Sequence, residues 1–494
     1  MTGSLAVPSR RSIAALGRAR SGAALFAAAT LAVAGSLLVG GCKAAPKPAP
    51  APDPDVQIPP GEHGLRKLSR EEYPDVRGAF MAKDDSMFEA LKQSGLWFAT
   101  NTSKSAYSSQ QLGPIAQVVA DHRQAAASVF AFRVLLDTVK DADAFQEAVY
   151  SQFDIWQTRG SDGKGKVLFT GYFSPEIKAS MQRTETFRFP LYQRPKDLVT
   201  DSQTGEPLGR QGADGTISPW PARKDILASG ELVGTELVWL ASAFDAYVCE
   251  VNGSAKLIMP DNSVKYVGYA GKTGRPYVGL GMSLVQDGVL TRRERTLGNI
   301  KRLYERDPGL VQRYIDRNEN MVFFSMYDAK AWPLGSLGVP VTAYGSLATD
   351  KKIFPRGLAM LVDTQTADYA GTMRPFNRFM FDQDTGGAIR AAGRGDIYMG
   401  VGAAAEVLAG NQYAEGTFHY FVLKPEFVEK YSQAVATLGP KSSAVKIQAR
   451  ALKPEEMPKE VDMETLIQMQ QEAAKSAGQK APPPPAQSQQ NPPR

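Results

Sequence analysis

Three aspartates stand close together in the segment FDQDTGGAIRAAGRGDIYMG, which runs from residue 381 to residue 400. Asp384 is followed by Gly386 and Gly387, and we expect these glycines to adopt positive φ and bring backbone amides close to a ligand. Asp396 opens a second apolar strand. A carboxyl group held among apolar residues can titrate near neutral pH. The segment therefore predicts acid and base chemistry.

Aspartate also caps turns, so a purely structural interpretation stays open for each of these residues. Asp384 and Asp396 are the candidates for chemistry, whereas Asp350, which lies upstream, is a third candidate expected to have a structural role. Asp382 directly follows Phe381, and we expect it at the protein surface. The sequence thus predicts one reacting carboxylate with supporting acids nearby.

Histidine and cysteine offer little other chemistry. His63, His122 and His419 lie far apart in the sequence and lack the spacing of metal ligands. A histidine-based triad is not expected, and neither is a metal or another cofactor. If Cys42 is modified, Cys249 remains as a lone thiol without a disulfide partner in the chain.

The N-terminal segment has the character of an export signal. Residues 1–41 contain four arginines, no acid and an apolar run from Ala23 to Val39, followed directly by Cys42. Small residues before a cysteine resemble the bacterial lipoprotein cleavage site, at which the cysteine is lipidated. A simple membrane anchor and an ordinary cleaved signal are the alternatives. Lys43 follows the cysteine, and this resembles an outer-membrane address.

Composition bounds the remaining architecture. The chain has 494 residues, of which 43% are hydrophobic and 22% charged, enough for two or three domains. Removing residues 1–41 lowers the formal net charge from +6 to +2, which does not favour nucleic-acid binding. Residues 42–63 are rich in proline and alanine and predict an extended tether. Residues 453–494 predict a disordered proline-rich tail.

The central region begins with helices and continues with strands. Asp84 is expected to cap a helix that ends near Leu96, Pro114 to begin one that ends near Val139, and Asp141 to begin one that ends near Thr158. From Lys164 onward the apolar runs are short, β-branched and separated by glycine, which predicts strands. A helical stretch at residues 297–317 interrupts these strands.

Five motifs in order across the last strand region resemble the three-aspartate (3D) domain of the membrane-bound lytic murein transglycosylase A family. They are Gly338–Val341, Ser346–Asp350, Pro355–Gly357, Asp384–Ile389 and Asp396–Tyr398. The resemblance extends upstream through four further segments. These are Phe169–Phe173, Pro190–Tyr192, Val251–Ser254 and Gly268–Tyr277.

This resemblance implies a mainly β fold with N-terminal helices. A six-stranded double-psi β-barrel would be assembled from residues 64–175 and 318–452, with the 3D segment at about 320–425. A second small β-barrel domain, residues 176–317, would be inserted into it. The glycan groove would lie between the two domains.

The resemblance also implies the reaction. The family cleaves the β-1,4 bond between N-acetylmuramic acid and N-acetylglucosamine of peptidoglycan and forms 1,6-anhydromuramic acid, which makes the expected enzyme a lytic exotransglycosylase and a carbon–oxygen lyase. Asp396 would be the single acid and base, and Asp384 would orient it. Expected substrate contacts come from both domains: Thr170, Tyr172, Asp350, Gly386, Gly387, Tyr269, Lys272 and Tyr277. Core packing is the alternative for the tyrosines.

Two other functions stay open. A murein or β-glucan hydrolase could use the same barrel with a second carboxylate and a water molecule. A non-catalytic lipoprotein could bind peptidoglycan without cleaving it. In all three cases the expected partners are glycan strands and, through Cys42, the periplasmic face of the outer membrane. Cell-wall synthesis or division proteins are possible further partners.

Overall fold

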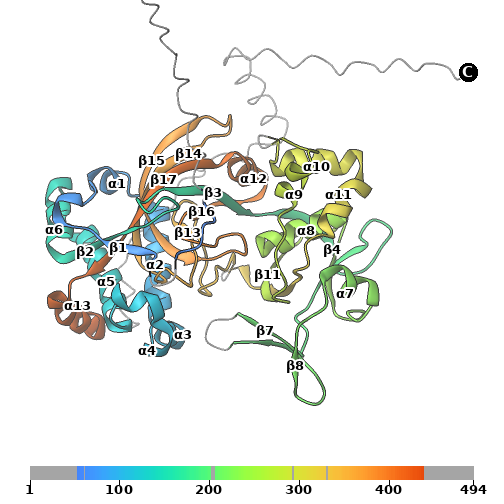
Figure 1. Cartoon of the computed structure of the whole chain (residues 1–494), viewed down its shortest axis with the longest axis horizontal. Coiled ribbons are helices and arrows are strands. Elements are labelled where there is room, and N and C mark those ends of the chain that lie inside the picture. Colours follow the sequence, from blue (N-terminus) through green and yellow to red (C-terminus); the bar gives the residue numbers. More distant parts are fainter. Residues whose placement is uncertain (1–52, 60–61, 202–205, 292–293, 330–331, 439–494) are drawn as a thin grey trace, which may run out of the picture. The chain divides into compact units, whose positions relative to one another are not determined.

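A computed structural model of the chain describes residues 53–59, 62–201, 206–291, 294–329 and 332–438 (Figure 1). All of these residues belong to one compact unit. The predicted signal segment, Cys42, most of the tether and the proline-rich tail lie outside the described residues. Within the described part of the chain, no helix combines the length and apolar character needed to cross a bilayer.

Short helices form the N-terminal part of the unit, as the capping residues predict. Asp84 and Asp141 each accept a hydrogen bond from the amide three residues along, which confirms both predicted helix starts. Pro114 instead lies in a 3-10 turn, Gly113–Gln117, and the following helix starts at His122 after the cap Asp121. The α-helices are α1 (Arg77–Met81), α2 (Asp85–Phe98), α3 (Asn101–Ala106), α4 (Ser109–Leu112), α5 (His122–Thr138) and α6 (Ala142–Gln152).

Eight strands form the first sheet. They are β1 (Leu65–Lys67), β2 (Phe153–Thr158), β3 (Val167–Ser174), β13 (Ser346–Ala348), β14 (Ala359–Ala367), β15 (Met373–Asp384), β16 (Arg394–Val401) and β17 (Tyr413–Leu423). Strand β2 takes residues that were predicted to end a helix. Strand β17 pairs with β14 and also with β3, so that β3, β17, β14, β15, β13 and β16 form a closed circuit of pairings.

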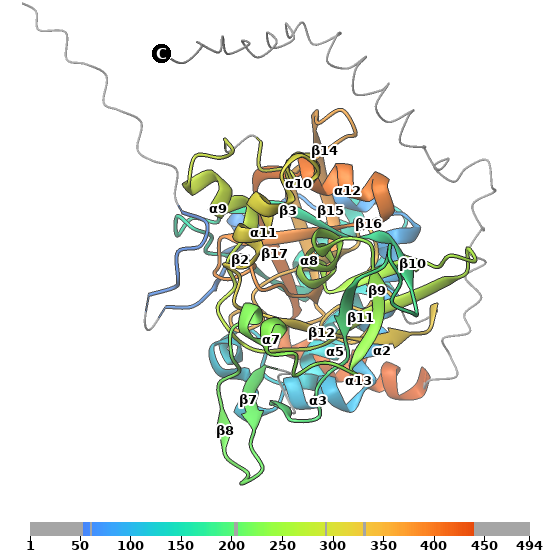
Figure 2. The ribbon, with the colours of Figure 1, turned by 90° about the vertical axis from the view of Figure 1, so that its right-hand side faces the viewer.

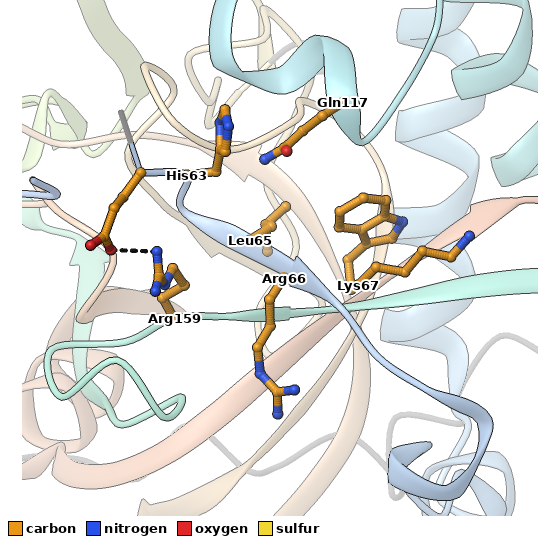
Figure 3. A pocket seen from close by; sticks show the side chains of 8 residues that line it. His63, Leu65, Arg66, Lys67, Gln117 and Arg159 are labelled. Carbon is orange, nitrogen blue, oxygen red and sulfur yellow. Dashed lines mark ion pairs between the residues drawn. The ribbon is translucent and has the colours of Figure 1, made fainter. Parts of the chain in front are cut away.

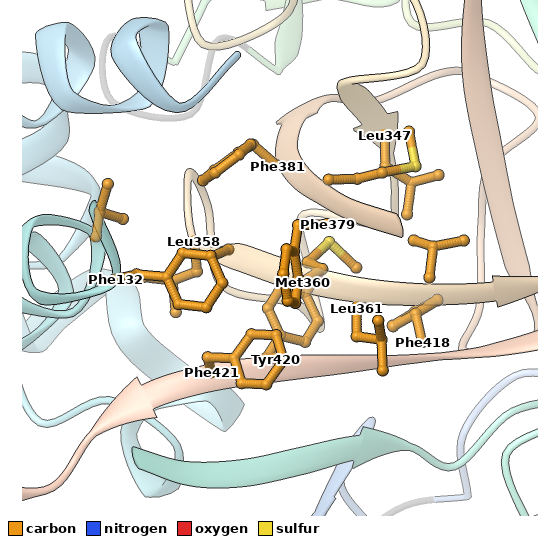
Figure 4. Packing of buried hydrophobic residues seen from close by; sticks show 14 of the residues in the cluster. Phe132, Leu347, Leu358, Met360, Leu361, Phe379, Phe381, Phe418, Tyr420 and Phe421 are labelled. Atoms are coloured by element: carbon orange, nitrogen blue, oxygen red, sulfur yellow. The ribbon is translucent and has the colours of Figure 1, made fainter. Parts of the chain in front are cut away.

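Aromatic side chains join the helices to this first sheet. The ring of Phe132 on α5 lies 5.0 Å from that of Phe379 on β15 and 5.2 Å from that of Phe421 on β17 (Figure 4). Phe145 on α6 packs against both Phe132 and Phe379. Burial of these rings fixes the helices on the outside of the strand circuit.

A second sheet has six strands in the order β12, β11, β10, β4, β9, β5. Their bounds are Val322–Tyr327, Val264–Lys272, Ser254–Ile258, Glu176–Ser180, Glu236–Leu240 and Phe189–Tyr192. Figure 2 labels four of them, β9 to β12. Helices α7 (Arg223–Ser229), α8 (Ala243–Asn252), α9 (Leu280–Gln286), α10 (Leu297–Arg306) and α11 (Pro308–Ile315) accompany it. Strand β4 follows β3 after a single residue, so the chain passes directly from the first sheet into the second.

The remaining elements are small. Strands β6 (Leu198–Thr200), β7 (Pro207–Gln211) and β8 (Ile217–Ser218) form a three-stranded sheet. Helix α12 (Gly402–Asn411) follows β16 and packs on β3 and β16. Helix α13 (Pro425–Leu438) packs against α5. The mainly β fold with N-terminal helices is therefore confirmed.

Candidate active site

The short strand β13 lies between the two strands that carry the predicted acids. Its last residue, Ala348, pairs with Asp384 of β15 on one side and with Asp396 of β16 on the other. A bulge between Leu347 and Ala348 skips Gln383 and brings Asp384 into this register. Two strand spacings separate the backbones of the acids, about 10 Å.

Strand β3 supplies a hydrogen-bond donor to each carboxylate. The Thr170 hydroxyl donates to Oδ1 of Asp396 at 2.9 Å, and the Tyr172 hydroxyl donates to Oδ2 of Asp384 at 2.7 Å. Thr170 and Tyr172 are two residues apart in one strand and therefore point to the same face. Asp384 and Asp396 thus lie on one face of the sheet.

Asp396 is a half-buried acid whose pKa lies near neutral pH. Burial raises the pKa of Asp396 to about 7, although the Thr170 hydroxyl and the charge of Arg394 both lower it, while the charge of Asp384 raises it further. Arg394 itself forms an ion pair with Asp55 at 3.2 Å. Among the described residues no cation forms an ion pair with Asp396, so this carboxyl group can carry a proton near pH 7.

Asp384 is held more tightly than Asp396. Besides Tyr172, the backbone amides of Ser336 and Thr385 each donate to Oδ1 at 2.8 Å. Burial raises the pKa of Asp384, and these three hydrogen bonds lower it. The carboxylate is therefore fixed in orientation by three donors, which suits a positioning and electrostatic role.

Asp382 was predicted at the surface, and this prediction is wrong. Its side chain is fully buried, where it forms an ion pair with Lys351 and accepts hydrogen bonds from the hydroxyls of Thr349 and Tyr420. A buried carboxylate requires such compensation. The bulge explains the error, because it lets Asp382 and Asp384 serve different environments although they lie two residues apart.

Asp350 anchors the turn that joins the two acidic strands. It is only 4% exposed, and its carboxylate accepts from the backbone amides of Lys352 and Ala391, each at 3.0 Å. Ala391 has φ of 85°, whereas neither Gly386 nor Gly387 has positive φ. The prediction of positive φ at these glycines is therefore wrong. The turn reverses at Ala391, whose amide Asp350 holds.

Tyr277 approaches the acids from the loop that follows β11. A Cβ atom on Gly387 would lie 3.8 Å from the Tyr277 ring, which is an ordinary van der Waals distance and shows that Tyr277 packs beside the glycine pair. The charge of Asp396 contributes to a raised pKa of Tyr277, although burial is the larger cause. The structure thus brings the predicted residue Tyr277 next to the candidate site.

Lys272 and Tyr269 lie on β11. Lys272 Nζ is 3.8 Å from a carboxylate oxygen of Glu206, and Arg390 of the acidic turn is 4.0 Å from the same carboxylate. Glu206 therefore connects β11 with the turn. Tyr269 is 42% exposed, and among the described residues it makes no hydrogen bond to either candidate acid. Lys272 thus borders the site through Glu206, and Tyr269 does not touch its acids.

Two contributors were not among the predicted site residues. The Ser336 amide reaches Asp384 from 48 residues upstream, in a loop without any local signal for such a contact. Tyr398, whose ring lies 5.1 Å from that of Tyr172, donates its hydroxyl to Ser174 at 3.0 Å. Its position two residues after Asp396 places it on the same face, and this strand alternation was the available signal.

The described residues contain no group of three or more His, Cys, Asp or Glu arranged to hold a metal ion. An open cavity of about 490 Å³ occurs at a different place, around residues 62–67, Trp156 and Arg159 (Figure 3). None of its lining residues belongs to the acidic site. Its cations are partly neutralised, for example Arg159 by Glu62.

Comparisons with known proteins agree with this geometry. Residues 168–325 match the model of the MltA specific insert domain, and residues 345–422 match the model of the 3D domain. The solved membrane-bound lytic murein transglycosylase from Agrobacterium tumefaciens aligns with a TM-score of 0.57 and 24% identity, covering 74% of this chain and 99% of that one. Escherichia coli MltA with bound chitohexaose aligns with a TM-score of 0.53 and 22% identity over 75% of this chain and 97% of that one.

Curated relatives carry the same family name. Membrane-bound lytic murein transglycosylase A of Vibrio cholerae is 31% identical over 270 residues, which are 53% of this chain and 68% of the relative. With the same insert, the same 3D domain and a relative matched over two thirds of its length, this chain belongs to the membrane-bound lytic murein transglycosylase A family.

Proposed function

We propose that this protein is a lytic transglycosylase that cleaves the β-1,4 bond between N-acetylmuramic acid and N-acetylglucosamine in peptidoglycan. The product end would be 1,6-anhydromuramic acid, and Asp396 would be the only residue that transfers protons. Family membership supports murein as the substrate. The solved relative that binds chitohexaose, an oligomer of N-acetylglucosamine, supports a glycan ligand for this fold.

The observation that carries the proposal is the environment of Asp396. Its side chain accepts a hydrogen bond from the neutral hydroxyl of Thr170, no cation among the described residues forms an ion pair with it, and burial raises its pKa to about 7. An acid with a pKa near the working pH is both a good donor and, once ionised, a good acceptor. Asp396 therefore has the properties required of a group that performs both proton transfers.

The reaction then needs one carboxyl group and no water. Asp396 gives its proton to the glycosidic oxygen while the bond from that oxygen to C1 of the muramoyl residue breaks. The 6-hydroxyl of the same residue forms a new bond to C1 and passes its proton to the ionised Asp396, which restores the acid. Ordinary glycosidases need a second carboxylate to attack C1 or to activate water. Here the sugar supplies the nucleophile.

Asp384 would support this cycle without transferring a proton. Its negative charge raises the pKa of Asp396, and its three donors keep it in place. It would also stabilise positive charge that develops on the sugar ring in the transition state. Thr170, Tyr172, Tyr277 and Lys272 would contact the glycan from the two sides of the acids.

Several finer properties belong to the same proposal. The closed circuit of six strands would be a double-psi barrel, interrupted by an inserted β domain at residues 176–317. Action would begin at strand ends, and lipidated Cys42 would hold the enzyme at the periplasmic face of the outer membrane. The word membrane-bound in the names of relatives supports membrane attachment.

Digestion of purified peptidoglycan by the residue 53–494 protein tests the reaction. Mass spectrometry of the released muropeptides should find muramic acid ends that are lighter than reducing ends by the mass of one water molecule. This mass difference is the signature of the anhydro ring. Reducing muramic ends would instead establish hydrolysis. Intact sacculi after prolonged incubation would support a non-catalytic binding protein.

A further inference from the structure

A row of paired residues leads away from Asp396 along the face of the first sheet. Asp396 pairs with Thr170 of β3, and Thr170 pairs in turn with Tyr413 of β17. Directly paired residues in neighbouring strands point to the same face of a sheet. Because the Thr170 hydroxyl bonds to Asp396, the face that Tyr413 shares is the face of the candidate active site.

Tyr413, the first residue of β17, is an exposed tyrosine. Tyr413 is 54% exposed, whereas Phe418 and Tyr420, which lie further along the same strand, are fully buried. An exposed aromatic ring beside a glycan-cleaving carboxylate can stack on a sugar ring. Core packing, the usual reason for a strand tyrosine, does not account for this position.

A cation from the inserted region covers part of this ring. Arg295, in the loop before α10, places its guanidinium carbon 4.9 Å from the centre of the Tyr413 ring. Its Nη1 atom contacts the sulfur of Met282 at 3.0 Å. Among the described residues no Asp or Glu forms an ion pair with Arg295, although other cations in this part of the chain form 23 such pairs. A guanidinium that is held by an aromatic ring and lacks an acid is a ready site for a carboxylate.

We infer that Tyr413 and Arg295 form a binding subsite for the peptide-substituted part of the substrate, with Tyr413 against a sugar ring and Arg295 on a carboxylate of the stem peptide. The inference rests on the proposed function. It extends that function by naming the substrate class, glycan strands that still carry their peptides. The neighbouring row of paired residues connects this subsite directly to Asp396.

Cleavage of two matched substrates tests the subsite. One is purified glycan strands with their peptides, and the other is the same strands after an amidase has removed the peptides. The Arg295→Met variant should lose about tenfold in kcat/KM on the first substrate and nothing on the second. Tyr413→Ala should lose about fivefold on both. Arg302→Met, which removes an exposed arginine from α10, serves as the matched control and should behave as the wild type.

The outcomes separate the two proposals. Equal losses of Arg295→Met on both substrates, or no loss on either, would overturn the peptide subsite while leaving the cleavage reaction intact. Binding of both strand types to the inactive Asp396→Asn protein gives a readout that does not depend on cleavage. In the Asp396→Asn protein, adding Arg295→Met should weaken the binding of peptide-bearing strands about tenfold and leave the binding of peptide-free strands unchanged. A wild-type protein without any cleavage activity would refute the proposed function, and the binding result would still decide the subsite.

Discussion

Asp382 and Asp396 are both acids within the strand circuit, and they are surrounded in opposite ways. Asp382 has a cation, Lys351, and two hydroxyl donors around a fully buried carboxylate. Asp396 has one hydroxyl donor, no paired cation among the described residues and a pKa raised to about 7 by burial. A buried acid that is paired with a cation makes the fold depend on that cation, whereas a buried acid without one is available for chemistry.

The largest effect is expected when the underpaired acid loses its ability to transfer a proton. Asp396→Asn should reduce muropeptide release by at least about a thousandfold, since no second proton donor shares its position. The amide can still accept the Thr170 hydrogen bond, so the fold should persist. Asp363→Asn, on β14 and exposed, is the matched control and should keep full activity. Residual cleavage within tenfold of wild type would remove Asp396 from its role.

Loss of the cation beside Asp382 should lower the stability of the fold. Lys351→Met leaves Asp382 charged and buried without its cation, which should lower the free energy of unfolding by about 3–5 kcal/mol in urea titrations. Its neighbour Lys352 is exposed, so Lys352→Met should change the free energy by less than about 0.5 kcal/mol. Adding Asp382→Leu to Lys351→Met should recover part of the loss. Equal stabilities of the Lys351→Met and Lys352→Met variants would show that Asp382 does not depend on its cation.

The pH dependence of the rate provides the third test. Donation requires protonated Asp396, whose fraction falls about tenfold per pH unit above its pKa, so kcat/KM should decline above about pH 7. The Thr170 hydroxyl lowers this pKa. Thr170→Val should therefore move the decline to higher pH, and kcat/KM should be measured from pH 5 to pH 9 in both proteins. A decline that moves to lower pH would show that Thr170 does not stabilise the ionised form.

The same pKa carries a consequence for stability. In the folded protein Asp396 keeps its proton up to about pH 7, whereas in the unfolded chain it loses it near pH 4. Between these values the folded state binds more protons, so this group lowers the stability as pH rises. Asp396→Asn should accordingly melt at a higher temperature than wild type at pH 8, with the difference shrinking toward pH 4.

The smallest effect is expected at the supporting acid. Tyr172→Phe removes one of three donors to Asp384 while the two backbone amides remain. A single hydrogen bond of this kind contributes about 1–1.5 kcal/mol, so kcat should fall about fivefold to tenfold. The measurement is the initial rate of anhydromuropeptide release. A loss as large as that of Asp396→Asn would place Tyr172 in the proton transfer itself.

Sequence motifs predicted the strands that carry the two acids because their signals are local. The apolar residues around Asp384 and Asp396 imply neighbouring strands, and both lie beside Ala348 as strands of one sheet. The helix caps Asp84 and Asp141 were equally local signals. Thr170 and Tyr172, in contrast, were placed near the acids only through the family resemblance, since they lie more than 200 residues upstream.

What could not be predicted depends on pairing across strands. The bulge at Ala348 is invisible in the sequence of β15, so strict alternation would give Asp382 and Asp384 the same surroundings. The partner Lys351 is also separated from Asp382 along the chain. The positive φ at Ala391 instead of the nearby glycines follows from the hydrogen bond to Asp350, a tertiary contact that overrides residue preference.

Ala348 fixes the backbone spacing between the two acids. Both acids are registered against this one residue, so the distance between their backbones is set by the repeat of the sheet and not by loops or side-chain packing. An insertion or deletion in a loop that keeps β13 paired with β15 and β16 should therefore leave the backbone spacing of the two acids unchanged.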